Sequence, residues 1–311
     1  MFLVCGEALY DVFISDGARP GDLNLGAVVG GSPFNVAVGL ARLGSKAALL
    51  TGISTDVLGE RLRESMTREG VDVSHIVRTG RRTTLSLVGL DATGTPSYTF
   101  YGVGSADCSL TVADMPTLSS DISGLHFGSY SIAVAPTADA FAHLARREQH
   151  RLISLDPNVR LNVEPDIAVW KNRIDALLPT ASLVKVSTED LGCLFPERTA
   201  DDVAQDWLSR GPALVIITDG AKGATARTHA VRVHIPARAI TVVDTIGAGD
   251  AFQAAILHQL RASHCLSRDA IRALDQAALT ELITTATRAA ALTCSRRGAD
   301  LPTAQDLQSV R

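Results

Sequence analysis

The part of the chain whose residue types are best suited to chemistry is 244–252, which reads DTIGAGDAF. The apolar residues after it recur at helical spacing, so a helix should begin near Ala248. The backbone N–H groups of Gly247, Ala248 and Gly249 would then lie at the helix N-terminus with no large side chain in front of them. Free N–H groups and the positive end of the helix dipole favour an anion, such as a phosphoryl group in transfer.

Asp250 stands directly beside this predicted anion site. A carboxylate there can accept the proton of an attacking hydroxyl, which is what phosphoryl transfer requires of a protein base. The alternative is structural: Asp250 would only favour the dipole of a helix that follows a glycine turn. Two aspartates around a loop almost free of side chains favour the catalytic interpretation.

A second pattern lies at 30–44 and reads GGSPFNVAVGLARLG. Ser32 is a typical N-cap residue, and Pro33 suits the first position of a helix. Asn35 then places an amide in the first helical turn, beside glycines that allow a ligand to approach closely. An amide can bind hydroxyl groups as donor and as acceptor. The alternative is that Asn35 caps the helix locally.

The elements that must position these residues alternate between short β-rich runs and helical patterns, which predicts βαβ units and a mostly parallel sheet covered by helices. The predicted strands include 3–5, 47–51, 152–155, 183–186 and 214–218. The predicted helices include 34–43, 58–69, 137–149 and 203–208. A helical C-terminal region is predicted at 248–263 and then, without a break, at 268–295.

Two segments, at about 9–30 and 79–107, interrupt this alternation. The first is rich in Gly, Asp and Asn, and the second alternates like exposed strands around a predicted turn at Gly94. We interpret them as one small β-sheet that acts as a lid on a single domain spanning residues 1–311. The alternative is an ordinary hairpin excursion.

The composition narrows the class of protein. The chain is 46% hydrophobic, has a formal net charge of −4 and contains no run of Lys or Arg, which argues against nucleic-acid and membrane binding. The N-terminus lacks the basic start and the apolar length of a signal peptide. Five scattered cysteines without a Cys-x-x-Cys pair are typical of reduced thiols in the cytoplasm. We therefore predict a cytoplasmic protein.

Together, the two glycine-rich patterns resemble the signatures of the PfkB (ribokinase-like) carbohydrate kinase family, and the resemblance covers nearly the whole chain. Segment 6–11 (GEALYD) is similar to the family's opening strand, segment 156–160 (DPNVR) to its fructokinase-like branch, and segment 218–224 (TDGAKGA) to its nucleotide-side turn. The resemblance implies a ribokinase-like α/β fold with a small β-sheet lid. It also implies transfer of the γ-phosphoryl group of ATP, with Mg²⁺, to a sugar hydroxyl.

The resemblance implies roles for individual residues. Asp250 would be the base, and the amides of Gly247, Ala248 and Gly249 would form the anion hole. The implied sugar-binding residues are Asp11, Gly31, Asn35 and Arg160, and the implied nucleotide-side residues are Lys185, Thr218, Gly220 and Gly223. The family's Asn-x-x-Glu motif stands here as STED at 187–190, so Asp190 would reach Mg²⁺ through water. A monovalent cation (K⁺) near Asp244 and a homodimer through the lid sheet are further implications.

Three functions fit these residues. The GEA start and DPNVR favour a fructokinase. A 2-keto-3-deoxygluconate kinase shares most features and would need a cation for the substrate carboxylate, which Arg160 could supply. A non-catalytic, sugar-binding regulatory protein would be expected to have lost Asp250 or the anion-hole glycines, and both are intact. No Walker A string and no clustered histidines occur.

Overall fold

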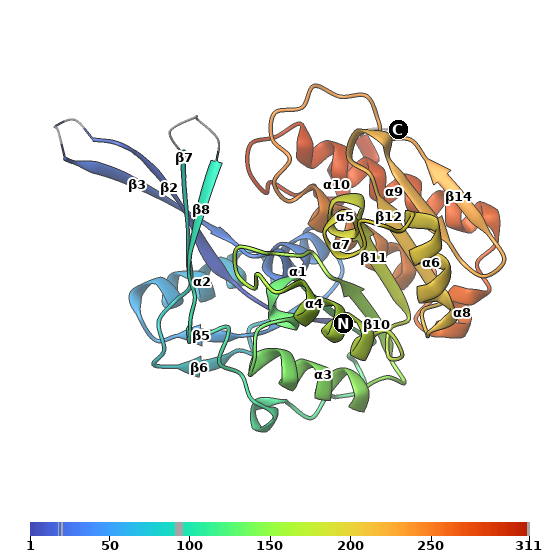
Figure 1. Ribbon diagram of the computed structural model, residues 1–311, viewed down its shortest axis with the longest axis horizontal. Coiled ribbons are helices and arrows are strands. Elements are labelled where there is room, and N and C mark those ends of the chain that lie inside the picture. The colour runs from blue at the N-terminus through green and yellow to red at the C-terminus, as the bar shows by residue number, and fades with distance from the viewer. Residues whose placement is uncertain (18, 20, 91–95, 310–311) are drawn as a thin grey trace.

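The structure, a computed structural model, describes residues 1–17, 19, 21–90 and 96–309. Its main body contains an eight-stranded sheet, and a smaller sheet projects to one side (Figure 1). In their order across it, the strands of the main sheet are β14 (Arg232–Ile235), β13 (Ala224–Arg227), β12 (Leu214–Thr218), β11 (Leu183–Ser187), β10 (Leu152–Asp156), β9 (Gly124–Gly128), β1 (Phe2–Cys5) and β4 (Ala47–Leu50). The strands from β12 to β4 are parallel, and β13 and β14 are antiparallel. The predicted, mostly parallel α/β architecture is confirmed.

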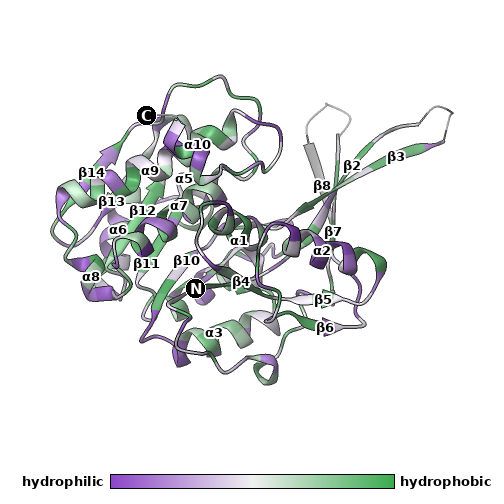
Figure 2. Ribbon diagram, turned by 180° about the vertical axis from the view of Figure 1, so that it is seen from behind, coloured by the Kyte–Doolittle hydropathy of each residue, from purple (hydrophilic) through white to green (hydrophobic). Residues whose placement is uncertain are grey.

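Helices cover both faces of this sheet. One layer contains α1 (Ser32–Arg42), α2 (Val57–Arg68), α7 (Ala248–Ala262), α8 (Arg268–Arg272) and α9 (Gln276–Cys294). The other layer contains α3 (Thr137–Arg147), α4 (Ile167–Leu177), α5 (Thr188–Leu194) and α6 (Ala200–Ser209). Side chains of β1 alternate between the two cores, with Phe2 on one side and Leu3 on the other, as strand geometry requires. Because both faces are covered, the central strands are buried and mostly apolar (Figure 2).

The helical C-terminal region differs from the prediction of one unbroken pattern at 268–295. Helix α8 ends at Arg272, and α9 begins after Asp275, whose carboxylate accepts a hydrogen bond from the backbone N–H of Ala278. An aspartate N-cap satisfies an N–H group that has no partner within the helix. The last helix, α10 (Ala304–Ser309), packs against α9.

The smaller sheet has the strand order β3 (Leu23–Gly30), β2 (Leu9–Asp16), β7 (Leu85–Leu90) and β8 (Pro96–Tyr101). It therefore joins two segments that are far apart in the sequence, as the two β-rich inserts predicted. Strand β2 is antiparallel to β3 and parallel to β7, and this places Asp11 between Val28 and Ser86. Two further short strands, β5 (Gly52–Ser54) and β6 (Val77–Thr79), pair with each other. The turn predicted at Gly94 lies outside the described residues.

Two further observations concern the described ranges. None of their helices is long and apolar enough to cross a membrane. The five cysteines are unpaired, and Cys5 and Cys108 are buried in the core.

Candidate active site

Asp250 lies in the first turn of α7 and is held by two side chains from the start of α1. The hydroxyl of Ser32 donates to Oδ1 of Asp250 at 2.6 Å, and the amide nitrogen of Asn35 donates to Oδ2 at 2.8 Å. Both contacts join residues more than 200 positions apart, since the sequence separations are 218 and 215. The two glycine-rich patterns of the sequence therefore meet at one carboxylate.

This geometry corrects the prediction that Ser32 caps α1. The N-cap is Gly31, with φ of 105°, and it makes no side-chain cap bond; Ser32 is already the first residue of the helix. Its hydroxyl is directed to Asp250 and not to the backbone of its own helix. A β-carbon on Gly31 would lie 2.8 Å from the carbonyl oxygen of Glu7, so only glycine fits at this N-cap.

The N-terminus of α7 has the form predicted from the sequence. Gly247 is its N-cap, in the left-handed conformation with φ of 79°, and the helix begins at Ala248. Within the part of the chain that the structure describes, the amides of Gly247 and Gly249 have no backbone acceptor. The amide of Ala248 has only a long contact of 3.3 Å to the carbonyl of Thr245. These N–H groups are available to an anion.

The loop that follows α9 packs directly behind this turn. A β-carbon on Gly247 would lie 2.8 Å from that of Ala299, and the amide of Gly298 donates to Oδ2 of Asp244 at 2.9 Å. A side chain at Gly247 would therefore displace this loop.

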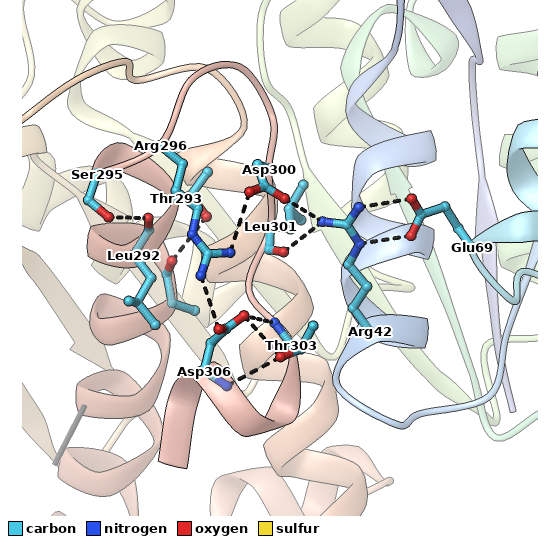
Figure 3. Close-up of polar contacts among 11 residues, drawn as sticks. Arg42, Glu69, Leu292, Thr293, Ser295, Arg296, Asp300, Leu301, Thr303 and Asp306 are labelled. Carbon is cyan, nitrogen blue, oxygen red and sulfur yellow. Dashed lines mark hydrogen bonds and ion pairs between the residues drawn. The ribbon is translucent and has the colours of Figure 1, made fainter. Parts of the chain in front are cut away.

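Arg42, near the end of α1, ties the same loop to two helices (Figure 3). Its guanidinium binds both carboxylate oxygens of Glu69 at 2.8 Å, at the end of α2. It also donates at 2.8 Å to Oδ1 of Asp300 and to the carbonyl oxygen of Leu301. A bidentate pair of this kind holds a fixed geometry, so Arg42 secures the loop that supports Gly247.

The pKa of Asp250 is raised above its ordinary value, because burial penalises the charged carboxylate. The hydrogen bonds from Ser32 and Asn35 and the positive charges of Lys185 and Arg160 act in the opposite direction. A carboxylate with a raised pKa is a better proton acceptor, and these four groups favour its ionised form.

Asp11 lies on β2 of the smaller sheet, and Arg160 lies close to it. Burial raises the pKa of Asp11, whereas a hydrogen bond with Ser86 and the charge of Arg160 lower it. Arg160 thus lies within electrostatic reach of both Asp11 and Asp250. A β-carbon on Gly30 would lie 2.3 Å from Oδ2 of Asp11, so glycine at this position leaves room for the carboxylate. The structure brings together the predicted residues Asp11, Gly31, Asn35, Arg160 and Asp250.

The residues predicted on the nucleotide side lie at the ends of neighbouring strands. Thr218 ends β12 and is paired with Ser187 at the end of β11. The turn after Thr218 uses two glycines with positive φ, Gly220 at 45° and Gly223 at 98°. A β-carbon on Gly223 would lie 2.0 Å from the carbonyl oxygen of Ile235. In open α/β sheets, ligands bind at the carboxyl ends of the parallel strands, where these residues lie.

Lys185 and Asp190 both have internal partners. The ammonium of Lys185 forms an ion pair of 2.8 Å with Oδ2 of Asp156, and both side chains are buried. Asp190 accepts hydrogen bonds from the amides of Val159 at 2.9 Å and Ser187 at 3.3 Å. The described residues contain no group of three or more His, Cys, Asp or Glu arranged to hold a metal ion.

Comparison with known proteins identifies the family of this chain. Residues 3–306 match the family described as pfkB family carbohydrate kinase. The chain belongs to the PfkB family of carbohydrate kinases. The chain is 39% identical over 280 residues to the fructokinase of Rhizobium leguminosarum bv. trifolii, which covers 90% of this chain and 85% of that protein. The predicted family and its fructokinase-like branch are confirmed.

Solved structures of PfkB kinases show the same fold. The ATP-bound fructokinase of Xylella fastidiosa superposes with a TM-score of 0.89 at 28% identity, covering 99% of this chain and 97% of that chain. A fructokinase double mutant from Vibrio cholerae O395, in its fructose-, ADP- and potassium-bound form, has a TM-score of 0.84 at 26% identity, with coverage of 99% and 97%. The ribokinase-like α/β fold with a separate small sheet is confirmed.

Sequence reasoning missed three contributors to the site. The local pattern predicts a cap at Ser32, the family resemblance covers Asp156 only as part of a segment, and Gly30 is predicted only to allow close approach. The local signal for Ser32 was ambiguous, because a serine before a helical pattern caps far more often than it reaches another helix. The partner of Lys185 could have been suspected, since a lysine inside an apolar strand requires a counter-charge.

Proposed function

We infer that this PfkB kinase is an ATP-dependent fructokinase that uses Asp250 as its base. The observation that carries the proposal is the convergence of Ser32 and Asn35 on Asp250, at the free N–H groups of α7. A relative 39% identical over 90% of this chain is named a fructokinase, which favours fructose over 2-keto-3-deoxygluconate. Asp250 and the anion-hole glycines are intact, which favours an enzyme over a non-catalytic sugar-binding protein.

The proposed reaction is an in-line phosphoryl transfer. The fructose hydroxyl forms a bond to the γ-phosphorus and gives its proton to Asp250, while the bond to the bridging oxygen of ADP breaks. The amides of Gly247, Ala248 and Gly249 would receive the charge of the phosphoryl group. This charge develops at fixed dipoles, so no reorganisation of solvent is needed.

The sugar would lie between the smaller sheet and α1. Asp11 would accept hydrogen bonds from sugar hydroxyls, and Gly31 would allow close approach. The amide nitrogen of Asn35 is already engaged with Asp250, which leaves its carbonyl oxygen for a hydroxyl of the sugar. Arg160, near both carboxylates, would neutralise the charge that collects there when the phosphoryl group arrives.

ATP would lie over the ends of β11 and β12, at Thr218, Gly220 and Gly223. A nucleotide contact of Lys185 would require release from Asp156. Asp190 would hold Mg²⁺ through water, and the ion would supply positive charge to the phosphates. The potassium-bound neighbour supports a monovalent cation near Asp244, whose carboxylate already anchors the loop at Gly298.

The smaller sheet would serve as a lid and as a dimer contact on the single domain. Three large apolar side chains on one face of it are exposed: Leu23 by 62%, Leu25 by 61% and Tyr101 by 58%. An exposed apolar face on a projecting sheet favours contact with a second copy. A chain that sediments as a monomer at micromolar concentration would contradict this contact.

A coupled ADP-release assay over ketoses, aldoses and keto-acids tests the function. We expect D-fructose to give the highest kcat/KM. The Asp250→Asn variant serves as the control for ADP release that does not come from this site. A clear preference for 2-keto-3-deoxygluconate would overturn the choice of substrate, and the absence of turnover with every sugar would overturn the proposed activity.

A further inference from the structure

The ammonium of Lys185 lies directly beneath the first turn of α7. The side chain is 5% exposed. A β-carbon built on Gly249 would lie 3.1 Å from the ammonium nitrogen. Among the described residues outside α7 and the chain neighbours of Gly249, the Lys185 ammonium is the one group within 4 Å of this β-carbon position. Lys185, the cation of the buried ion pair with Asp156, therefore lies against the turn that carries Gly249 and Asp250.

The titratable groups around this ammonium come from four elements. Asp156 on β10 binds it at 2.8 Å, and Asp190 on α5 and Asp250 on α7 lie within electrostatic reach. His126 on β9 faces it as well, and burial together with Lys185 lowers the pKa of His126 to about 3, so that this histidine is neutral.

Asp250 itself faces two cations, Lys185 from below and Arg160 from the loop after β10. Its other neighbours, Ser32 and Asn35 on α1, are uncharged. Arg160 is exposed to solvent, whereas Lys185 is enclosed by protein. Because charges interact more strongly where water is excluded, Lys185 should have the greater effect per unit charge.

We propose that Lys185 is a positioning residue that supplies a fixed positive charge behind the anion hole, in place of the nucleotide contact predicted from the sequence. This inference rests on the proposed kinase function. The ammonium favours the ionised form of Asp250, and it favours negative charge at the N–H groups of α7 when the phosphoryl group is transferred. Asp156 holds the ammonium in place, and Gly249 lets the helix approach it.

The test separates this role from a purely structural ion pair. The double variant Lys185→Met, Asp156→Asn replaces the pair by neutral side chains of similar size, a change that buried pairs often tolerate. If the pair only stabilises the fold, this variant should have wild-type kinetics. We expect instead that kcat for fructose falls by about 10- to 100-fold with little change in KM. In the pH profile of kcat, the loss of activity on the acid side should shift to higher pH by about 1 unit.

A second variant tests the sign of the charge. Asp156→Asn alone removes the anion and leaves the cation, so its acid limb should lie at or below that of the wild type. Arg151→Met, which breaks a largely buried ion pair with Glu148 just before the N-terminal end of β10, is the control for general destabilisation and should have wild-type kinetics.

The outcomes distinguish this inference from the proposed function. Wild-type enzyme that is inactive on every sugar would overturn the function. Active wild-type enzyme with an equally active double variant would overturn the role of Lys185. An upward shift of the acid limb in Asp156→Asn would also overturn the role of Lys185. This second test remains available even if the double variant does not fold.

Discussion

The Asp250→Asn variant should have a kcat that is lower than that of the wild type by about 10²- to 10⁴-fold, with fructose binding mostly kept. Asparagine retains the size of the side chain and the start of α7, but it cannot accept the proton of the sugar hydroxyl. Steady-state kinetics by ADP release gives kcat, and titration with fructose gives the dissociation constant. A variant within a few-fold of the wild type would remove Asp250 from the role of base.

The matched control keeps the carboxylate and changes only its environment. Ser32→Ala removes the 2.6 Å hydrogen bond that lowers the pKa of Asp250. Since the base must be ionised, activity is lost as the pH falls through this pKa, and a higher pKa moves that loss to higher pH. We expect an upward shift of about 1 pH unit with kcat at high pH largely retained. A large loss at every pH would indicate that Ser32 does more than tune the carboxylate.

The Asp11→Ala variant should bind fructose more weakly by about 10- to 100-fold, because a charge-assisted hydrogen bond to a sugar hydroxyl is lost. The effect should appear mainly in KM, since Asp11 is proposed to contact the sugar away from the reacting oxygen. Removing the carboxylate from the vicinity of Arg160 should leave the pKa of Asp250 little changed.

The control for this variant is Ser15→Ala, which alters an exposed residue on the same face of the same strand, β2. It should bind fructose as the wild type does. An unchanged dissociation constant in Asp11→Ala would show that the sugar lies elsewhere, and an equal loss in Ser15→Ala would point to a general disturbance of the smaller sheet.

Most of the elements could be predicted from local patterns. Apolar runs such as Leu214–Thr218 form buried strands, and the helical period after Gly249 forms α7, because short-range spacing decides which face of an element is apolar. The prediction of one unbroken helix at 268–295 was wrong for a local reason: Asp275 caps a new helix. Both the apolar period and the cap are short-range features, and the cap decides where α9 begins.

The sequence by itself determined the family, the glycine-rich N-terminus of α7 and the identity of its aspartate, because those features are contiguous in the chain. Only the tertiary structure decided what those residues touch. Ser32 meets Asp250 across 218 positions, and Lys185 meets Asp156 across 29. Such contacts depend on the order of strands in the sheet and on which helix lies over which strand end. Strand order is a property of the whole packed chain, and no local spacing encodes it.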